Sequence, residues 1–339
     1  MCGIIGYIGK PPVVEIVLDA LSRLEYRGYD SAGVAVLNGQ GLYVCKRAGK
    51  LKELRAALQT QTIDGHLGIG QTRWATHGEP SEVNAHPHLD CRGQIALVHN
   101  GIIENYAQLK TRLIAQGHRF QSQTDTEVIA HLIEEEAKTL PLGEAFRKAL
   151  QELRGSYALA LVATSDPEHV YGARCGSPLI VGVGKGEMFL ASDVPAVLAK
   201  TRRVIYLNDQ EVVELSSSGV RVMTLEGKPI GRKPSRVTWD LSSAQKEGYA
   251  HFMLKEIHEQ PKAAEQTLFN RLASAAPQIA FDRRTNTLLN RLSPDERIVI
   301  LACGTAYHAG MVGEYMLEEF AKIPVDVDLA SEFRYRGTP

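Results

Sequence analysis

The sequence predicts an α+β fold for most of the chain, followed by the beginning of a separate α/β domain. Short apolar strand patterns near the start give way to amphipathic helical segments between about residues 106 and 153, and strand patterns return from residue 156 to residue 223. This order has no regular alternation of strand and helix, which favours helices packed on antiparallel sheets. From residue 297 the pattern becomes strand, helix, strand, which is typical of a parallel βαβ unit.

The elements follow from the spacing of apolar residues and from turn residues between them. Strands are predicted at residues 4–8, 34–37, 68–71, 95–98, 157–163, 179–183, 188–191, 204–206, 211–215, 220–223, 297–302 and 325–329. Helices are predicted at residues 13–24, 106–116, 126–138, 143–153, 249–264 and 306–321. Asn38-Gly39 predicts a hairpin, and so does the glycine-rich stretch 182–186, because it lacks the full phosphate-loop pattern.

A chain of 339 residues is long enough for about two domains. The segment 227–247 contains two prolines and two adjacent serines, and it reads as a connection between them. We therefore expect a first domain at residues 2–240, a linker at 241–249 and a second domain at 250–339. One βαβ unit cannot cover both faces of a parallel sheet, so we expect the second domain to be truncated.

Charge and hydropathy exclude several classes of partner. Thirty-eight basic residues stand against 39 acidic ones, so the sequence shows no electrostatic footprint for nucleic acid. No apolar run is long enough to cross a membrane, and the N-terminus has no secretory signal pattern. We expect a cytoplasmic protein with no nucleic-acid or membrane partner.

The five cysteines are an odd number and lie far apart, at positions 2, 45, 91, 175 and 303. They show no C-x-x-C spacing, which argues against a disulfide framework or a structural zinc site. We expect the last four to be small buried hydrophobic residues. Cys2 differs because it directly follows the initiator methionine.

Cys2 could carry two catalytic groups on one residue. If Met1 is removed, the thiol is a nucleophile and the free α-amine is a general base at neutral pH. Gly3 and Gly6 would allow close approach of backbone and substrate. The alternative is an ordinary first strand that contains a cysteine.

Several motifs in order resemble the class II glutamine amidotransferases, which use an N-terminal nucleophile. They are Cys2-Gly3-Ile4 and the segments 27–33, 72–80, 84–88, 99–105 and 124–127. Within that class, segments 251–261 and 301–305 are most similar to the glutamine–fructose-6-phosphate aminotransferase (isomerizing) family. This resemblance implies an αββα sandwich of the N-terminal-nucleophile type, followed by part of a Rossmann-like sugar-phosphate-isomerase (SIS) domain.

The resemblance also implies roles for individual residues. Cys2 would attack the side-chain amide of L-glutamine, and Asn100 and Gly101 would form the oxyanion hole. Arg73 would bind the α-carboxylate and Asp125 the α-ammonium group of glutamine. Taken alone, Asn100-Gly101 would read as a hairpin turn, Arg73 as a surface ion pair and Asp125 as a helix cap.

Three further residues belong to the expected glutamine site. Thr76 and His77 lie in a loop that resembles the family's closing lid, and Trp74 corresponds to a residue thought to gate an internal ammonia passage. In the second domain, Gly304 and Thr305 resemble the loop that contacts fructose 6-phosphate. The family pattern has serine after that threonine, and here Ala306 replaces it.

The family's remaining sugar-phosphate residues lie beyond residue 339. We therefore expect this chain to carry the glutaminase half-reaction and not to make glucosamine 6-phosphate by itself. The resemblance implies no metal or organic cofactor, and a homodimer for the full-length enzyme. Alternatives are another class II amidotransferase, such as amidophosphoribosyltransferase or asparagine synthetase, and a non-catalytic sugar-phosphate sensor built on the SIS fold.

Four histidines, at positions 77, 86, 88 and 99, fall within a short stretch and raise the question of a metal site. None has the paired spacing of a zinc-binding helix. We expect structural or substrate-loop roles for them, and no metal.

Overall fold

The computed structural model describes residues 2–10, 12–59, 61, 63–75, 78–238, 249–268, 281, 283–291, 293 and 296–337. The chain divides into two compact units, Met1–Gly248 and Tyr249–Pro339. Over the described ranges, no helix combines the length and the apolar character needed to cross a membrane.

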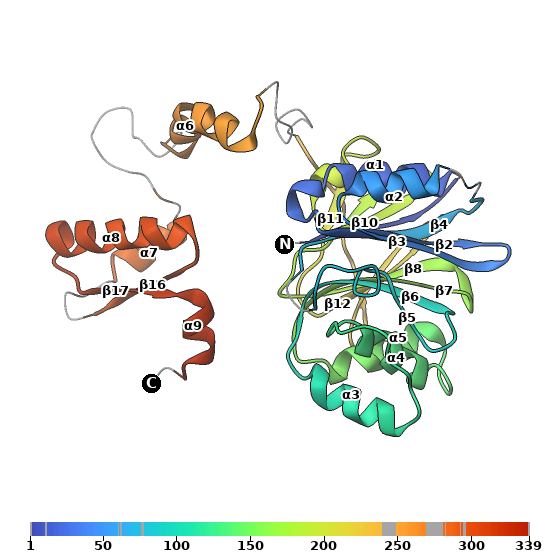
Figure 1. Cartoon of the computed structure of the whole chain (residues 1–339). Helices are drawn as coiled ribbons and strands as arrows, with labels where there is room; N and C mark the ends of the chain where they lie inside the picture. Colours follow the sequence, from blue (N-terminus) through green and yellow to red (C-terminus); the bar gives the residue numbers. More distant parts are fainter. Residues whose placement is uncertain are drawn as a thin grey trace. The chain divides into compact units, whose positions relative to one another are not determined.

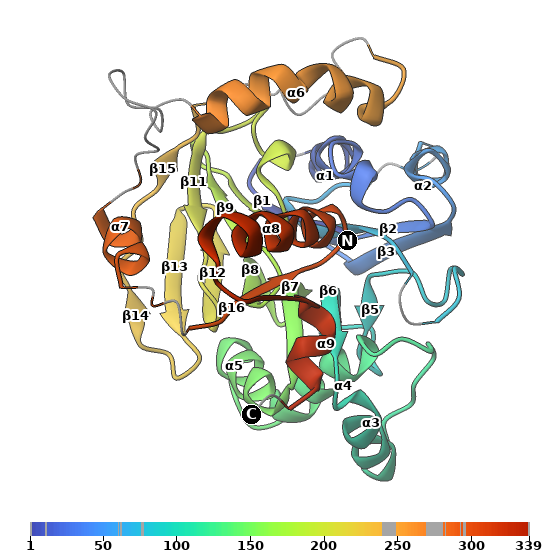
Figure 2. The same cartoon turned by 90° about the vertical axis from the view of Figure 1, so that its left-hand side faces the viewer.

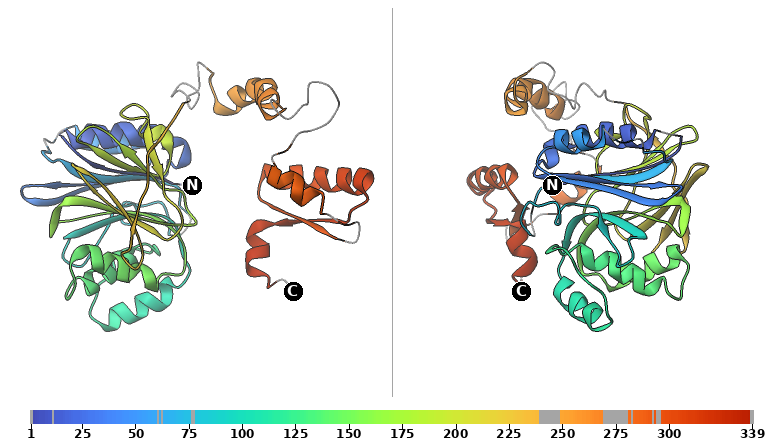
Figure 3. Two further views of the ribbon diagram at one scale, coloured as in Figure 1. Left: turned by 180° about the vertical axis from the view of Figure 1, so that it is seen from behind. Right: turned by 45° about the vertical axis from the view of Figure 1, so that its right-hand side comes forward.

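The first unit has four layers, helix, sheet, sheet and helix (Figures 1 and 3). Helices α1 (Val13–Ser22) and α2 (Leu51–Leu58) cover one sheet, and α3 (Tyr106–Ala115), α4 (Glu127–Glu136) and α5 (Leu142–Glu152) cover the other. The α+β prediction and the αββα sandwich implied by the resemblance are confirmed.

Both sheets of this unit are antiparallel. The eight-stranded sheet has the order β15 (Ser235–Arg236), β11 (Arg203–Tyr206), β9 (Ile180–Val183), β10 (Met188–Ala191), β1 (Gly3–Ile8), β4 (Leu67–Arg73), β2 (Ser31–Asn38) and β3 (Gly41–Ala48). The seven-stranded sheet, seen from one edge to the other in Figure 2, has the order β14 (Pro229–Ile230), β13 (Gly219–Thr224), β12 (Glu211–Ser216), β8 (Asp166–Cys175), β7 (Gly155–Ala163), β6 (Ile95–Ile103) and β5 (His88–Leu89).

Alternating side chains of β1 enter two different hydrophobic layers. Ile5 and Tyr7 pack with α1 and α2, whereas Ile4 and Ile8 pack between the two sheets. A third cluster fills the space between the seven-stranded sheet and helices α3 to α5. Because β1 is buried on both faces, the start of the chain is held inside the sandwich.

The second unit contains the expected βαβ arrangement. Strands β16 (Ile298–Ala302) and β17 (Val325–Leu329) are parallel and are joined by α8 (Thr305–Ala321); α6 (Phe252–Leu268), α7 (Arg283–Leu289) and α9 (Ala330–Tyr335) complete it. Gly310 of α8 packs on Ile300 and Val327. Val299 and Leu301 point the other way and are 47% and 43% exposed.

Some local expectations are wrong, and one alternative is excluded. β6 continues through Asn100 and Gly101 to Ile103, which excludes the alternative that this pair forms a hairpin turn. Of the four cysteines expected to be buried, Cys45 is buried, Cys175 is half-buried, and Cys91 and Cys303 are exposed. Helix α2 and strand β8 have no counterpart among the predicted elements. The hairpins after Asn38 and after Val183 are confirmed.

Candidate active site

The start of β1 and the end of β4 lie side by side, because Gly3 pairs with Thr72 in the antiparallel register. This register brings Cys2 next to Arg73 and Trp74. The end of β6, from the other sheet, and the segment before α4 close the same pocket. Its lining residues are Cys2, Arg73, Trp74, His86, His99, Gly101, Thr124, Asp125 and Thr126.

The thiol of Cys2 contacts both main-chain polar groups of Trp74, the N–H and the carbonyl oxygen. The Trp74 N–H donates to Sγ, with 3.2 Å between the atoms, and Sγ lies 3.5 Å from the Trp74 carbonyl oxygen. Burial raises the pKa of the Cys2 thiol, while the Trp74 N–H and the charge of Arg73 act in the opposite direction. A nearby base is therefore needed to make the thiolate at neutral pH.

Asn100 connects the second sheet to the nucleophile. Its Nδ2 donates to the main-chain carbonyl oxygen of Cys2 over 2.8 Å. Its Oδ1 accepts from Nε2 of Gln71, 2.9 Å away, and the same Gln71 amide donates to the carbonyl oxygen of His99. Gln71 thus fixes the amide orientation in which Asn100 turns its N–H groups toward Cys2.

Gly101 occupies a backbone conformation that other residues rarely adopt, with a φ of 136°. A Cβ at this position would lie 2.0 Å from the carbonyl oxygen of Ser156. Both observations require glycine, and they explain why the end of β6 can line the pocket with its main chain.

Arg73 and Asp125 are both buried, with exposed fractions of 4% and 5%. The Arg73 guanidinium donates to the carbonyl oxygens of Gly78, at 3.1 Å, and Glu79, at 3.3 Å. Burial lowers the pKa of Arg73, and Cys2 and Asp125 are among the neighbours that oppose this effect. Asp125 Oδ2 accepts from the N–H of Ile103 at 2.7 Å. The pocket therefore holds a buried cation at the end of β4 and a buried anion just before α4.

Asp30, a residue of segment 27–33 for which the sequence predicts no individual role, holds the turn around Arg73. Its N–H donates to the Arg73 carbonyl oxygen, and its carboxylate accepts from the N–H of Ala75. Gly28 packs so closely that a Cβ there would lie 2.6 Å from the Arg73 carbonyl carbon. The glycine and aspartate of segment 27–33 thus shape the wall beside Cys2.

Buried histidines form a chain of hydrogen bonds behind the pocket. His99 Nε2 faces the Ser156 carbonyl oxygen at 3.3 Å, so this nitrogen carries the proton and Nδ1 accepts from the Thr126 hydroxyl at 2.8 Å. The Thr126 oxygen in turn accepts from His86 Nε2 at 3.1 Å. Burial lowers the pKa of both imidazoles, so they are neutral.

Comparison with known proteins gives the same picture. The glutamine amidotransferase domain family matches residues 72–199, and the SIS domain family matches residues 291–338. A glutamine–fructose-6-phosphate aminotransferase (isomerizing) of Thermus thermophilus is 52% identical over 338 residues, which is 99% of this chain and 54% of the relative. The enzyme of Aquifex aeolicus is 49% identical over the whole chain and 55% of its own length.

Over 99% of its length the chain is therefore similar to glutamine–fructose-6-phosphate aminotransferases, and it carries segments that match a glutamine amidotransferase domain and a SIS domain. It spans about half the length of the curated relatives that it matches.

Solved structures agree on the fold. The glutamine phosphoribosylpyrophosphate amidotransferase of B. subtilis, complexed with ADP and GMP, aligns with a TM-score of 0.58 at 20% identity, over 100% of this chain and 71% of that one. A structure of the allosteric regulatory enzyme of purine biosynthesis aligns with a TM-score of 0.57 at 23% identity, over 100% and 70%. At such identities the likeness shows the fold alone.

The remaining residues expected from the family lie in different surroundings. Trp74 is 47% exposed and packs edge-on against Tyr29, with 5.4 Å between ring centroids. Thr76 and His77 lie outside the described residues. Gly304 and Thr305 are exposed in the second unit, where Gly304 has a φ of 61° and precedes α8.

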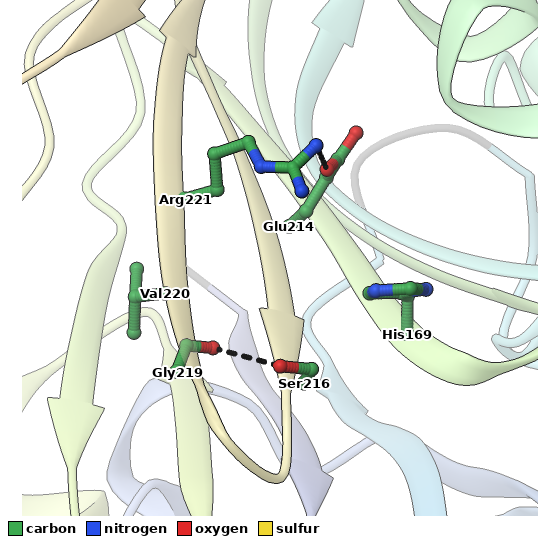
Figure 4. A pocket seen from close by; sticks show the side chains of 6 residues that line it. All are labelled: His169, Glu214, Ser216, Gly219, Val220 and Arg221. Carbon is green, nitrogen blue, oxygen red and sulfur yellow. Dashed lines mark hydrogen bonds and ion pairs between the residues drawn. The ribbon is translucent and has the colours of Figure 1, made fainter.

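A second hollow in the first unit offers no comparable chemistry. It lies over β8, β12 and β13, where Glu214 and Arg221 face one another across paired strands and form an ion pair of 3.0 Å (Figure 4). His169 lies beside them and is paired with Asp166 at 2.8 Å. Because these charges neutralise one another and no nucleophilic thiol lies among the lining residues, the family's chemistry is better assigned to the pocket around Cys2.

Proposed function

We propose that the chain hydrolyses L-glutamine to glutamate and ammonia, with Cys2 as the nucleophile. The observation that carries this proposal is the convergence of one thiol, one buried cation and one buried anion in a single pocket, with the carboxamide of Asn100 fixed on the main chain of the thiol's residue. These groups match the four demands of the reaction, which are attack, oxyanion stabilisation, carboxylate binding and ammonium binding.

In the proposed reaction, the Cys2 sulfur bonds to the side-chain carbonyl carbon of glutamine, and the carbonyl π electrons move to oxygen. The second N–H of the Asn100 amide and the main chain of Gly101 stabilise that oxyanion. The Cys2 α-amine, available once Met1 is removed, takes the thiol proton and passes it to the departing nitrogen. Collapse releases ammonia and leaves a glutamyl thioester, which water hydrolyses to glutamate and the free thiol.

The main chain of Trp74 supports the nucleophile in this mechanism. Its N–H donates to Sγ and stabilises a negative sulfur, while the Arg73 charge acts in the same direction. Arg73 has a planar guanidinium that suits a carboxylate, and Asp125 supplies an acceptor for an ammonium group. We propose Trp74, Thr76 and His77 as parts of the surrounding loop.

The relatives are named for transfer of an amino group to fructose 6-phosphate. We propose that this chain supplies the glutaminase half of such a reaction, and that Gly304 and Thr305 belong to a sugar-phosphate loop. In support, the loop lies between a parallel strand and a helix N-terminus, where main-chain N–H groups favour an anion.

The deciding experiment measures glutamate released from glutamine by the wild-type chain and by Cys2→Ala. Cys175→Ala serves as the matched control, because Cys175 ends β8 and does not line the pocket. We expect turnover in the wild type and the control, and none in Cys2→Ala. An electrophilic glutamine analogue should add its mass to the peptide that begins at Cys2.

Two further measurements complete the test: the intact mass of the protein, and the binding and conversion of the sugar phosphate. Turnover in a preparation that wholly retains Met1 would exclude the α-amine as base. Absence of turnover in protein that has lost Met1, together with tight sugar-phosphate binding, would instead favour the non-catalytic sensor. Formation of glucosamine 6-phosphate from glutamine and fructose 6-phosphate by this chain would contradict the restriction to the glutaminase half.

A further inference from the structure

Four side chains from three separate segments converge on one point beside α4, away from the pocket around Cys2. They are Cys91, in the turn between β5 and β6, His118, after α3, and His131 and Glu134, both on α4. One ligand atom from each lies within 4.8 Å of all the others. The two histidines are buried, Glu134 is half-buried and Cys91 is exposed.

The distances within this cluster fit a tetrahedral set of ligands. Sγ of Cys91 lies 3.5 Å from Nδ1 of His118 and 3.4 Å from Nδ1 of His131, and the two nitrogens are 3.3 Å apart. Glu134 Oε2 lies 3.1 Å and 3.4 Å from the same nitrogens. Tetrahedral zinc, with Zn–S of about 2.3 Å and Zn–N or Zn–O of about 2.0–2.1 Å, separates its ligand atoms by about 3.3–3.6 Å.

The other ring nitrogens determine which atoms carry protons. His118 Nε2 lies 2.9 Å from a Glu135 carboxylate oxygen, and His131 Nε2 lies 3.5 Å from Glu127 Oε1. Because an ionised carboxylate only accepts, Nε2 of His118 carries a hydrogen, whereas Nε2 of His131 makes no hydrogen bond with Glu127. When each ring carries its single hydrogen on Nε2, both Nδ1 atoms present lone pairs to each other and to Glu134.

A cation at the centre of this arrangement would be attracted by all four atoms. With each ring singly protonated on Nε2, two imidazole lone pairs, a carboxylate oxygen and a sulfur share one thiol proton, and the main-chain N–H groups of Cys91 and Arg119 donate to Glu134 Oε2 and to Cys91 Sγ. The carboxylates behind the rings form the outer partners that typically orient zinc-bound histidines. Glu127 is itself well fixed, because its carboxylate accepts from the N–H groups of Gln121 and Ser122 at 2.7 Å and 2.6 Å.

We propose that Cys91, His118, His131 and Glu134 form a structural binding site for a divalent transition metal, with Zn²⁺ as its ion. Thiolate, two imidazoles and one carboxylate suit zinc, and four protein ligands leave no open position for catalysis. The site ties the β5–β6 turn and the end of the α3 segment to α4. The chain between His118 and α4 carries Asp125, so the ion would hold that segment in place.

Zinc content of the tag-free wild-type chain is the first measurement, after loading with Zn²⁺ and dialysis against metal-free buffer. We expect one zinc per chain, and a melting temperature that falls when a strong chelator is added. Cys91→Ser should lower the affinity for Zn²⁺ by more than about 100-fold, and Glu135→Gln, which alters only an outer partner, by about 10–100-fold. Cys303→Ser, the matched exposed cysteine in the other unit, should bind like the wild type.

Cobalt substitution keeps the test decisive even if a variant does not fold. Co²⁺ bound by this set should show the visible bands of a tetrahedral ion and a thiolate-to-cobalt charge-transfer band. Failure of the wild type to retain zinc, equal zinc retention by folded Cys91→Ser, or an octahedral cobalt spectrum would each overturn the proposal in favour of a hydrogen-bonded cluster.

Discussion

The side-chain amide of Asn100 donates to the main-chain carbonyl oxygen of Cys2, with 2.8 Å between Nδ2 and O. The two residues are 98 positions apart: Cys2 directly precedes β1, and Asn100 lies within β6 of the other sheet. One N–H of this amide is thus used to anchor the nucleophile's main chain. The other remains for the oxyanion of the proposed reaction.

Asn100→Ala should lower kcat for glutamine hydrolysis by about 10²–10³-fold, which is the usual effect of removing one oxyanion-hole donor. KM should change much less, because the amide acts on charge that develops in the transition state. Steady-state glutamate release measures both constants, with the melting temperature as a check on folding. A variant with unchanged kcat would remove Asn100 from the proposed mechanism.

Gln71 should act as a positioning residue through Asn100. Gln71→Glu replaces the amide donor by a carboxylate that can only accept, so it repels Asn100 Oδ1 and favours the flipped amide. We expect kcat to fall by roughly 10–100-fold with little change in KM, since misplacement of a catalytic group has effects of this size. Gln71→Met, which keeps the size but removes both polar atoms, separates loss of the donor from repulsion. Equal kcat for all three proteins would contradict this role.

Gly101→Ala should destabilise the fold as well as abolish turnover. The φ of 136° alone costs a residue with a Cβ about 1–3 kcal/mol, and the new Cβ would also collide with the Ser156 carbonyl oxygen. Gly93→Ala is the matched control, because Gly93 has a φ of 66° but open space around it, for an expected cost of about 1–2 kcal/mol. Denaturant midpoints compare the two; a smaller loss in Gly101→Ala than in the control would contradict the prediction.

The spacing of apolar residues predicted most of the strands and helices, because the two-residue period of a strand and the helical period directly reflect which side chains are buried. It failed where a tertiary contact decides the conformation. Asn100-Gly101 has the composition of a hairpin, yet its pairing with Tyr157 and Ala158 keeps it inside β6. β8 was missed because its first half, near Asp166 and Glu168, is polar and partly exposed, so it does not read as an apolar run.

The pocket was predicted only through the family resemblance, and two kinds of residue escaped it. Gln71 lies within an expected strand and shows no pattern that distinguishes a buried donor from an ordinary polar residue. The Cys91 cluster escaped because its ligands come from three elements and are separated by 27 and 13 positions. Closeness in sequence instead draws attention to histidines 77, 86, 88 and 99. Of these, His86 and His99 bond to the Thr126 hydroxyl and His88 to that of Thr124.

Stability should decrease with falling pH because His86, His88 and His99 are buried in neutral form. Burial lowers the pKa of all three, and that of His88 to about 3. An unfolded chain binds a proton at each of them near the ordinary value of 6.5, whereas the folded chain does not. Their contribution is therefore fully present above about pH 6.5 and is lost progressively below it; for His88, whose folded pKa lies far below this range, the loss approaches about 1.4 kcal/mol per pH unit.

Urea unfolding at a series of pH values between about 7 and 5 measures how the free energy of unfolding changes with pH. In this range Asp and Glu side chains contribute less, because they titrate at lower pH. A chelator in every sample prevents acid release of a bound metal from adding to the slope. His88→Gln keeps an acceptor for the Thr124 hydroxyl but cannot titrate, so its slope should be shallower by the equivalent of one proton. A slope equal to that of the wild type would mean that His88 takes up its proton in the folded protein too.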